Sequence, residues 1–172
     1  YILHQELKSY VPVVEFLGKA LGSQYEVVLH DFTDPEHAIV SIANGHLSGR
    51  QVGSPMTNLA MKMLQDDVAQ QGNGKTYIVQ HEASGKDGTP FSSSTMLLRD
   101  NSGKAVGALC INFNVKAFLG LQEFIESVGL GENKPANQPG AKHYEGEILS
   151  DAGSSALESV YHTVMDKRLN ID

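Results

Sequence analysis

Residues 25–57, YEVVLHDFTDPEHAIVSIANGHLSGRQVGSPMT, decide the fold. They contain two strand-like apolar runs, at residues 25–32 and 38–43, separated by the turn formers Thr33, Asp34 and Pro35. We expect these two strands to pair as neighbours. A dense polar loop, NGHLSGR, follows the second run, and the stretch carries no catalytic motif of metabolic enzymes. It therefore indicates a sensor.

A helix is expected before this stretch. Apolar residues recur there every three or four positions, as on one face of a helix: Leu3, Leu7, Val11, Val14, Leu17 and Leu21. Pro12 lacks an N–H, so the helix either kinks there or begins again with Pro12 in its first turn. Gly22 is expected to end it.

A second helix is expected after the polar loop, with Ser54 as its cap and Pro55 in its first position. Its buried face would carry Met56, Leu59, Ala60, Met63, Leu64 and Val68. A strand at residues 75–82 follows, and then a hairpin, with strands at 92–100 and 104–114. The last strand is apolar on both faces, which is typical of the middle of a sheet.

The chain after the hairpin is expected to form a helix that turns Phe118, Leu121, Ile125 and Val128 inward. The order of elements predicts an α+β fold with a five-stranded antiparallel sheet, flanking helices and an appended C-terminal helix. PAS and GAF sensor domains share this architecture, and the strand order favours the PAS-like form. We assign residues 1–128 to a sensor domain, 129–150 to a loop or linker, and 151–172 to a connector helix. Its Leu157, Val160, Val164 and Ile171 have a near-heptad spacing that suits dimer contact.

Composition excludes several classes of protein. With 172 residues, 41% of them hydrophobic, the chain can bury one ordinary core. Its net charge is -7, and the sequence contains no basic patch of the kind that binds nucleic acid. No signal peptide or apolar run of membrane-spanning length is visible, so a cytoplasmic protein without membrane contact is expected. The single cysteine, Cys110, lies in an apolar strand and is expected to pack in the core.

Three segments resemble a known family: LHDFTDP, NGHLSGRQVGSPMT and TMLLRDNSGKAVGALCIN. They are similar to the YheO-like PAS domain of bacterial transcriptional regulators, over about residues 6–124. The resemblance implies a sensor that is followed by a DNA-binding helix-turn-helix, which this chain does not contain. Residues 155–171 would then lead toward that module.

Polar residues in the NGHLSGR loop are candidate ligand contacts: Asn44, His46, Ser48 and Arg50. Arg50 can hold a carboxylate or phosphate with two parallel hydrogen bonds, so a small anionic or amino-acid-like metabolite would suit the loop. The alternative is that these residues only satisfy the polar groups of an irregular loop.

Five further candidates lie on strands. His30 and Asp31 are adjacent and should point to opposite faces, so separate ligand contacts or core hydrogen bonds are favoured over a direct pair. Tyr77 and His81 are expected on one face of the third strand, where both could line a cavity. Arg99 could join them or only flank the hairpin turn.

No cofactor is predicted. The seven histidines include no HExxH pair and there is no CxxC, which disfavours zinc. Haem would require an axial ligand from His30, His37, His46 or His81, and Cys110 lacks the helical context of a flavin photosensor. The GKT at residues 74–76 lies between a helix and a strand, the reverse of a P-loop.

Three functions remain open. The first is a ligand-sensing and dimerisation domain of a transcriptional regulator, a homodimer that contacts DNA only through a module outside this chain. The second is a small-molecule enzyme with His30, His46 or Asp31 as acid or base. The third is a structural dimerisation module that binds no ligand.

Overall fold

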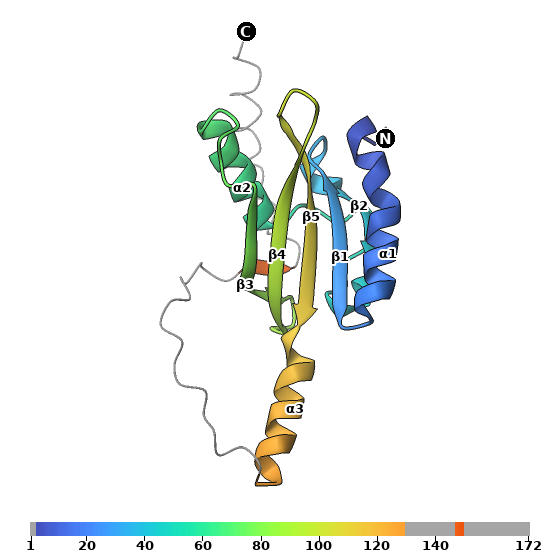
Figure 1. Ribbon diagram of the computed structural model, residues 1–172, viewed down its shortest axis with the longest axis vertical. Coiled ribbons are helices and arrows are strands. Elements are labelled where there is room, and N and C mark those ends of the chain that lie inside the picture. Colours follow the sequence, from blue (N-terminus) through green and yellow to red (C-terminus); the bar gives the residue numbers. More distant parts are fainter. Residues whose placement is uncertain (1–2, 130–146, 150–172) are drawn as a thin grey trace.

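The computed structural model describes residues 3–129 and 147–149 of the chain. Its centre is one sheet with the strand order β2-β1-β5-β4-β3-β6 (Figure 1). The strands are β1 (Tyr25–Asp31), β2 (Ile39–Ala43), β3 (Tyr77–Gly85), β4 (Pro90–Arg99), β5 (Ala105–Asn114) and β6 (Glu147–Leu149).

Strands β1 to β5 pair antiparallel, which confirms the predicted α+β sheet, and β5 lies mid-sheet between β1 and β4. The short β6 pairs parallel with β3. It falls in the stretch for which we expected a loop or linker. The rest of that stretch, and the expected connector helix, lie outside the described residues.

The N-terminal helix does begin again at the proline. A 3₁₀ helix, η1 (Gln5–Tyr10), leads into α1 (Val11–Leu21), which has Pro12 in its first turn. Gly22 ends α1 with a φ of 90°, a conformation that L residues with side chains rarely adopt.

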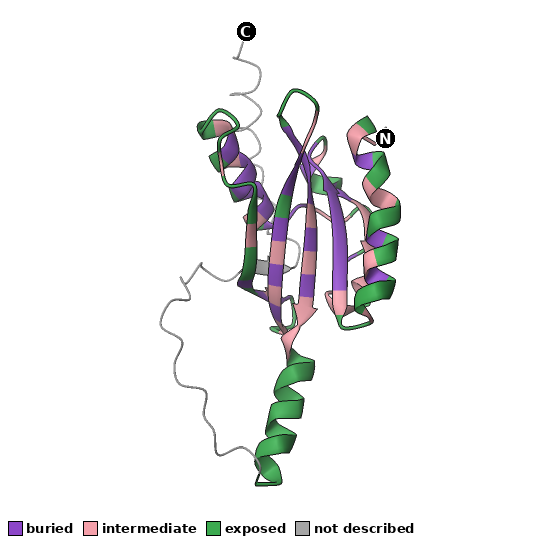
Figure 2. Ribbon diagram, viewed as in Figure 1, coloured by how far each residue is buried: buried purple, intermediate pink, exposed green. Residues whose placement is uncertain are grey.

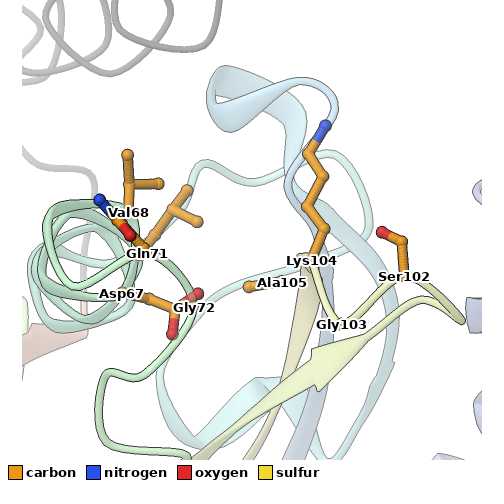
Figure 3. Close-up of a pocket in the computed structure, with 9 residues that line it drawn as sticks. Asp67, Val68, Gln71, Gly72, Ser102, Gly103, Lys104 and Ala105 are labelled. Atoms are coloured by element: carbon orange, nitrogen blue, oxygen red, sulfur yellow. The ribbon is translucent and has the colours of Figure 1, made fainter. Parts of the chain in front are cut away.

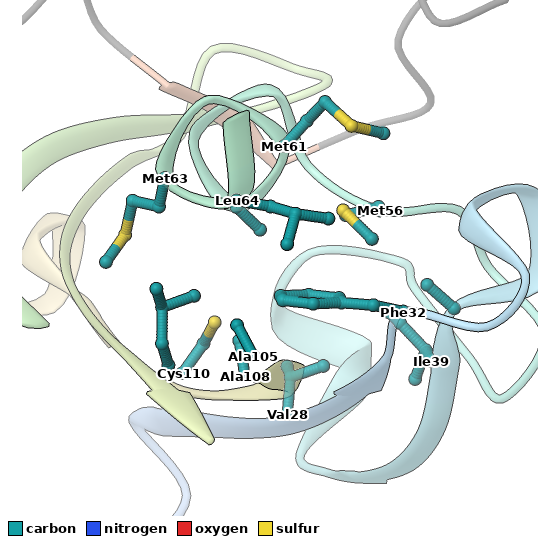
Figure 4. Packing of buried hydrophobic residues seen from close by; sticks show 13 residues of the cluster. Val28, Phe32, Ile39, Met56, Met61, Met63, Leu64, Ala105, Ala108 and Cys110 are labelled. Carbon is teal, nitrogen blue, oxygen red and sulfur yellow. The ribbon is translucent and has the colours of Figure 1, made fainter. Parts of the chain in front are cut away.

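The two faces of the sheet are covered by different helices. On the outer face, η1 and α1 pack Leu7 and Val14 against Val27 and Leu29 of β1. On the inner face, α2 (Asn58–Ala69) closes a core rich in methionine (Figure 4). Members of that core include Val28, Phe32, Ile39, Met56, Met61, Met63, Leu64, Ala105, Ala108 and Cys110. The expected core position of Cys110 is confirmed.

Helix α2 begins later than the sequence predicted. Its N-cap is Thr57, whose hydroxyl accepts a hydrogen bond from the N–H of Ala60 at 3.3 Å. Ser54 instead accepts from the N–H of Gln51 in the preceding turn, at 3.1 Å. The N–H of Met56 bonds to the carbonyl of Pro35, so the chain between Ser54 and Thr57 is held against the 3₁₀ turn η2 (Pro35–His37) and cannot start a helix.

Replacing Thr57 by Ala should therefore lower the free energy of unfolding by about 1 kcal/mol, the usual loss on removing an N-cap hydroxyl. Ser54→Ala, at the cap that the sequence suggested, should change it by less than about 0.5 kcal/mol. Urea unfolding followed by circular dichroism measures both. Equal losses in the two variants would contradict the assignment of the cap.

The predicted inward face of the last helix is wrong. Helix α3 (Val115–Ser127) continues from the end of β5 and extends away from the sheet (Figure 1). No residue of α3 is buried, and Phe118 and Leu121 are 57% and 54% exposed (Figure 2). The apolar stripe is present as expected, but the described part of the chain places no core against it.

Candidate functional site

A buried polar cluster lies on the inner face of the sheet around Glu26 of β1. The Glu26 side chain is 0% exposed and forms an ion pair with Nη2 of Arg50. The hydroxyl of Ser48 donates to the second carboxylate oxygen of Glu26. The amide of Asn112 on β5 donates to the first at 2.9 Å. Three donors, two from the polar loop and one from β5, therefore compensate one buried carboxylate.

Close packing of the polar loop brings Arg50 to this cluster. The 3₁₀ turn η3 (Gly45–Leu47) begins the loop, and a Cβ added to Gly45 would lie 2.4 Å from the carbonyl oxygen of Arg50. Only glycine allows the backbone to approach so closely at this position. Ser48 also accepts from Nε of Arg50 at 3.2 Å, which fixes the direction of the guanidinium.

Two buried polar atoms beside the cluster have no hydrogen-bond partner among the described residues: Nη1 of Arg50 and Nε2 of His30. Buried polar atoms in folded proteins usually have a partner, because leaving one without costs about 1 to 3 kcal/mol. These two atoms are therefore where an additional hydrogen-bonding group, from a bound molecule or an ordered water, would be stabilised.

His30 is neutral at ordinary pH. Its side chain is fully buried, and its Nδ1 lies 3.8 Å from Sγ of Cys110. Burial, and secondarily the positive charge of Arg50, lowers the pKa of His30 to about 3. An imidazole without charge can serve as a donor or an acceptor toward a ligand.

Further hydroxyl groups extend the polar surface across the sheet. Ser93 on β4 donates to the side-chain oxygen of Asn112, and Thr95 donates to the Cys110 sulfur at 3.4 Å. Both hydroxyl-bearing residues are buried. They join the Glu26 cluster to the methionine-rich core through β5.

The predicted loop residues separate in the structure. Ser48 and Arg50 meet at Glu26, so the carboxylate that Arg50 holds comes from the protein itself. Asn44 turns away and donates to the backbone carbonyls of Gly18, Gly22 and Tyr25, which ties α1 to the sheet. His46 is exposed. Asn44 therefore satisfies polar groups of the irregular loop and of the end of α1, as the alternative interpretation expected. Its φ of 57° is left-handed, a conformation that asparagine tolerates better than most residues.

Asp31 and Arg99 also have structural roles in the described contacts. Asp31 accepts from the backbone N–H groups of His4 and Thr33, at 3.0 and 2.8 Å, and lies on the face opposite His30 as expected. Arg99 forms a bidentate pair with Asp67 of α2, with N–O distances of 2.6 and 3.0 Å. This pair fastens the end of α2 to the hairpin, away from Glu26.

Tyr77 and His81 do not share a face, contrary to our expectation. Tyr77 pairs with Met96 on the outer face and is 61% exposed, whereas His81 pairs with Ser93 and is buried on the inner face. The cause is a register shift between residues 78 and 81, where Gln80 adopts a φ of 53°. One extra residue in a strand turns each later side chain to the opposite face of the sheet.

Sequence reasoning missed Glu26, Asn112 and Ser93. A signal for Glu26 was present, because Glu26, Val28 and His30 alternate along β1 and must share one face. A charged residue on the same face as a buried valine requires a buried partner. The partner could not be identified from spacing, since Arg50 is 24 residues away.

A separate hollow of about 370 Å³ lies between the end of α2 and the β4–β5 turn (Figure 3). Its lining includes the core residues Leu64 and Ala105, the paired Asp67, and Lys104. The hollow therefore borders the methionine-rich core at the end near the β4–β5 turn, and it does not reach the Glu26 cluster.

Within residues 3–129 and 147–149, no group of three or more His, Cys, Asp or Glu side chains is arranged to hold a metal ion. No helix in these same residues has the length and apolar character required to cross a bilayer.

The antiparallel strands β1 to β5 with their flanking helices form the α+β sheet of a PAS-type domain. The chain belongs to the YheO-like PAS domain family, whose model matches residues 3–129. The resemblance seen in the three sequence segments is thereby confirmed.

Two curated relatives support this assignment. The chain is 39% identical over 110 residues to the uncharacterized protein YheO of Escherichia coli K12, covering 63% of this chain and 44% of that protein. It is 30% identical over 112 residues to the transcriptional regulator DauR of Pseudomonas aeruginosa, covering 65% and 49%. The chain thus spans about half the length of these relatives.

Among solved structures, a PAS domain from Colwellia psychrerythraea is similar with a TM-score of 0.38 and 17% identity, covering 64% of this chain and 98% of that one. The dark structure of the Aureochrome1 LOV photoreceptor has a TM-score of 0.39 and 18% identity, covering 75% and 99%.

Proposed function

We propose that residues 1–128 form the ligand-sensing and dimerisation domain of a bacterial DNA-binding transcriptional regulator. Residues 129–150 would be a linker, and residues 151–172 a connector toward a DNA-binding module outside this chain. Membership of the YheO-like family and the relative named as a transcriptional regulator support a regulatory role. The proposed regulator is a homodimer and acts in the cytoplasm, where its DNA is.

The observation that carries ligand sensing is a pair of buried atoms that have no hydrogen-bond partner in residues 3–129 and 147–149, Nη1 of Arg50 and Nε2 of His30. They lie on the inner face of the sheet beside the Glu26 carboxylate. A small metabolite with an acceptor oxygen, such as a carboxylate or carbonyl, would receive a charge-assisted hydrogen bond from Arg50. The methionine-rich core next to it can repack around a bound molecule because methionine side chains are flexible.

Regulation would follow from a population shift. A ligand changes the balance between two arrangements of the domain only by the difference in its affinity for them. Coupling of about 1 to 3 kcal/mol is typical of such systems and would alter the DNA affinity of an attached module about 5- to 150-fold.

Native mass spectrometry of the protein purified from its host tests this proposal first. We expect a small molecule in fixed ratio to the chain that is released unchanged on denaturation. A molecule that the protein converts into another during incubation would favour the enzyme alternative. A protein that carries no molecule and binds none from a metabolite extract would favour the structural module.

Binding of the identified molecule then tests the site. Arg50→Lys keeps a positive charge beside Glu26 but lacks the second nitrogen of the guanidinium, so affinity should fall by about 1.5 to 3 kcal/mol. Tyr77→Ala, on the outer face, is the control and should leave affinity unchanged. Calorimetry measures both, and an unchanged affinity in Arg50→Lys would remove Arg50 from the site.

A further inference from the structure

Helix α3 presents an apolar surface that the described part of the domain does not cover. Its large apolar side chains are each between 38% and 63% exposed: Phe118, Leu119, Leu121, Phe124 and Ile125, with Val128 directly after the helix. After Val115 every residue of the helix is drawn as exposed in Figure 2, in contrast to α1 and α2, which each bury one face.

Four of these residues are spaced as in a helix that packs lengthwise against a second helix. Phe118, Leu121, Ile125 and Val128 follow one another at intervals of three, four and three residues. This is the pattern of the a and d positions of a coiled coil, which form a seam along one side of the helix. Phe124 lies beside the seam and widens it.

The charges of α3 also fit pairing with an identical helix. The positions that flank the seam carry Val115, Ala117, Gln122 and Phe124, none of which is charged. The charged residues of α3, Lys116, Glu123 and Glu126, occupy positions away from the seam. Two copies can therefore meet along α3 without placing like charges opposite each other, although each chain has a net charge of -7.

We propose that α3 is the seam of a symmetric dimer, in which it pairs in parallel with α3 of a second copy of this chain. This rests on the proposed dimerisation function and assigns the surface that performs it. The two phenylalanines, about three-fifths exposed, alone supply roughly 200 Å² of apolar area per copy. With Leu121, Ile125 and Val128, the seam reaches only the low end of specific interfaces, so the dimer should depend on concentration.

Pairing through α3 would also connect the candidate ligand site to the dimer. Helix α3 continues directly from β5, whose Asn112 contacts Glu26 and whose Cys110 contacts His30. A molecule bound at that cluster would act on the strand from which the seam helix extends. The seam therefore connects the candidate ligand site to the relation between the two copies.

Sedimentation velocity of the chain of 172 residues across a range of concentrations tests the seam. The unchanged chain should shift from monomer to dimer as concentration rises. Leu121→Glu places a charge at a d position, and we expect the dissociation constant to rise at least about 100-fold. Ser127→Glu adds the same charge on the opposite side of α3 and should leave the dimer intact.

Cysteine cross-linking tests the orientation. In a parallel pair the two copies of residue 121 face each other, so Leu121→Cys should give a disulfide-linked dimer on mild oxidation. Glu123→Cys, on the outer side of α3, should not. The native Cys110 is 4% exposed and contributes little background.

The outcomes separate this inference from the proposed function. If Leu121→Glu dimerises as strongly as the unchanged chain, another surface forms the dimer and α3 is not the seam, while dimerisation itself stands. If the unchanged chain is a monomer at every concentration, both dimerisation and the seam are overturned, and ligand binding is unaffected. A monomer in which hydrogen exchange shows α3 protected would mean that residues 130–172 cover it, which also overturns the inference.

Discussion

Replacing Arg50 by Met is expected to lower the free energy of unfolding by about 3 to 5 kcal/mol, because it leaves the Glu26 carboxylate buried without its cation. Glu26 is 0% exposed, so water cannot take the place of the guanidinium. Ser48 and Asn112 would still donate to the carboxylate, but neither supplies a charge. Chemical denaturation at neutral pH, followed by circular dichroism, measures this loss.

Lys19→Met is the matched control, since it also removes the basic partner of a carboxylate. The Lys19–Glu15 pair has an N–O distance of 2.7 Å and side chains 76% and 69% exposed. Solvent screens an exposed pair of this kind, and holding its two side chains in one geometry costs entropy, so the control should change stability little. Similar losses in Arg50→Met and Lys19→Met would show that Glu26 is solvated and that the buried cluster does not exist.

A double variant separates the buried charge from the lost contacts. Glu26→Gln keeps one of the two acceptor oxygens, removes the charge and leaves the Ser48 hydroxyl free to reorient as an acceptor. In Glu26→Gln with Arg50→Met no unpaired buried charge remains, so the double variant should be more stable than Arg50→Met alone. A double variant at least as unstable as the sum of the two single changes would mean that charge compensation is not what Arg50 supplies.

Acid should destabilise the domain through His30. Its pKa is about 3 in the folded protein, against about 6.5 in an unfolded chain. The unfolded state therefore binds the proton more readily, and stability present above about pH 6.5 is lost as the pH falls toward 3. At 1.36 kcal/mol per pKa unit, lowering the pH from about 7 to about 5 should cost about 2 kcal/mol.

Other groups also titrate, so the measurement compares the free energy of unfolding as a function of pH for the unchanged chain and for His30→Gln. Over this pH range the unchanged chain should lose about 2 kcal/mol more than His30→Gln, which cannot be protonated. The control His37→Gln removes a histidine that is 66% exposed, and it should follow the unchanged chain. Parallel curves for the unchanged chain and His30→Gln would show that His30 is accessible to water.

Much of the fold could be predicted from local patterns. The apolar runs at residues 25–32 and 38–43 and the hairpin after residue 92 appear as β1, β2, β4 and β5, because each strand carries its own signal of β-forming residues between turn formers. Pro12 and Gly22 likewise marked the start and end of α1. The cap of α2 was misplaced because Ser54 is intrinsically at least as good an N-cap as Thr57, and the contact of Met56 with Pro35 overrides that preference.

The sequence by itself determined the α+β class, the neighbouring strands and the family, since these depend on residues close together in the chain. The tertiary structure decided the site. It selected Ser48 and Arg50 from the polar loop by bringing Glu26 and Asn112 to them, and it separated Tyr77 from His81 by a shift of register. It also left the apolar stripe of α3 facing outward. Periodicity states which residues share a face, but whether that face meets a core, a carboxylate or a second copy depends on contacts between segments far apart in the sequence.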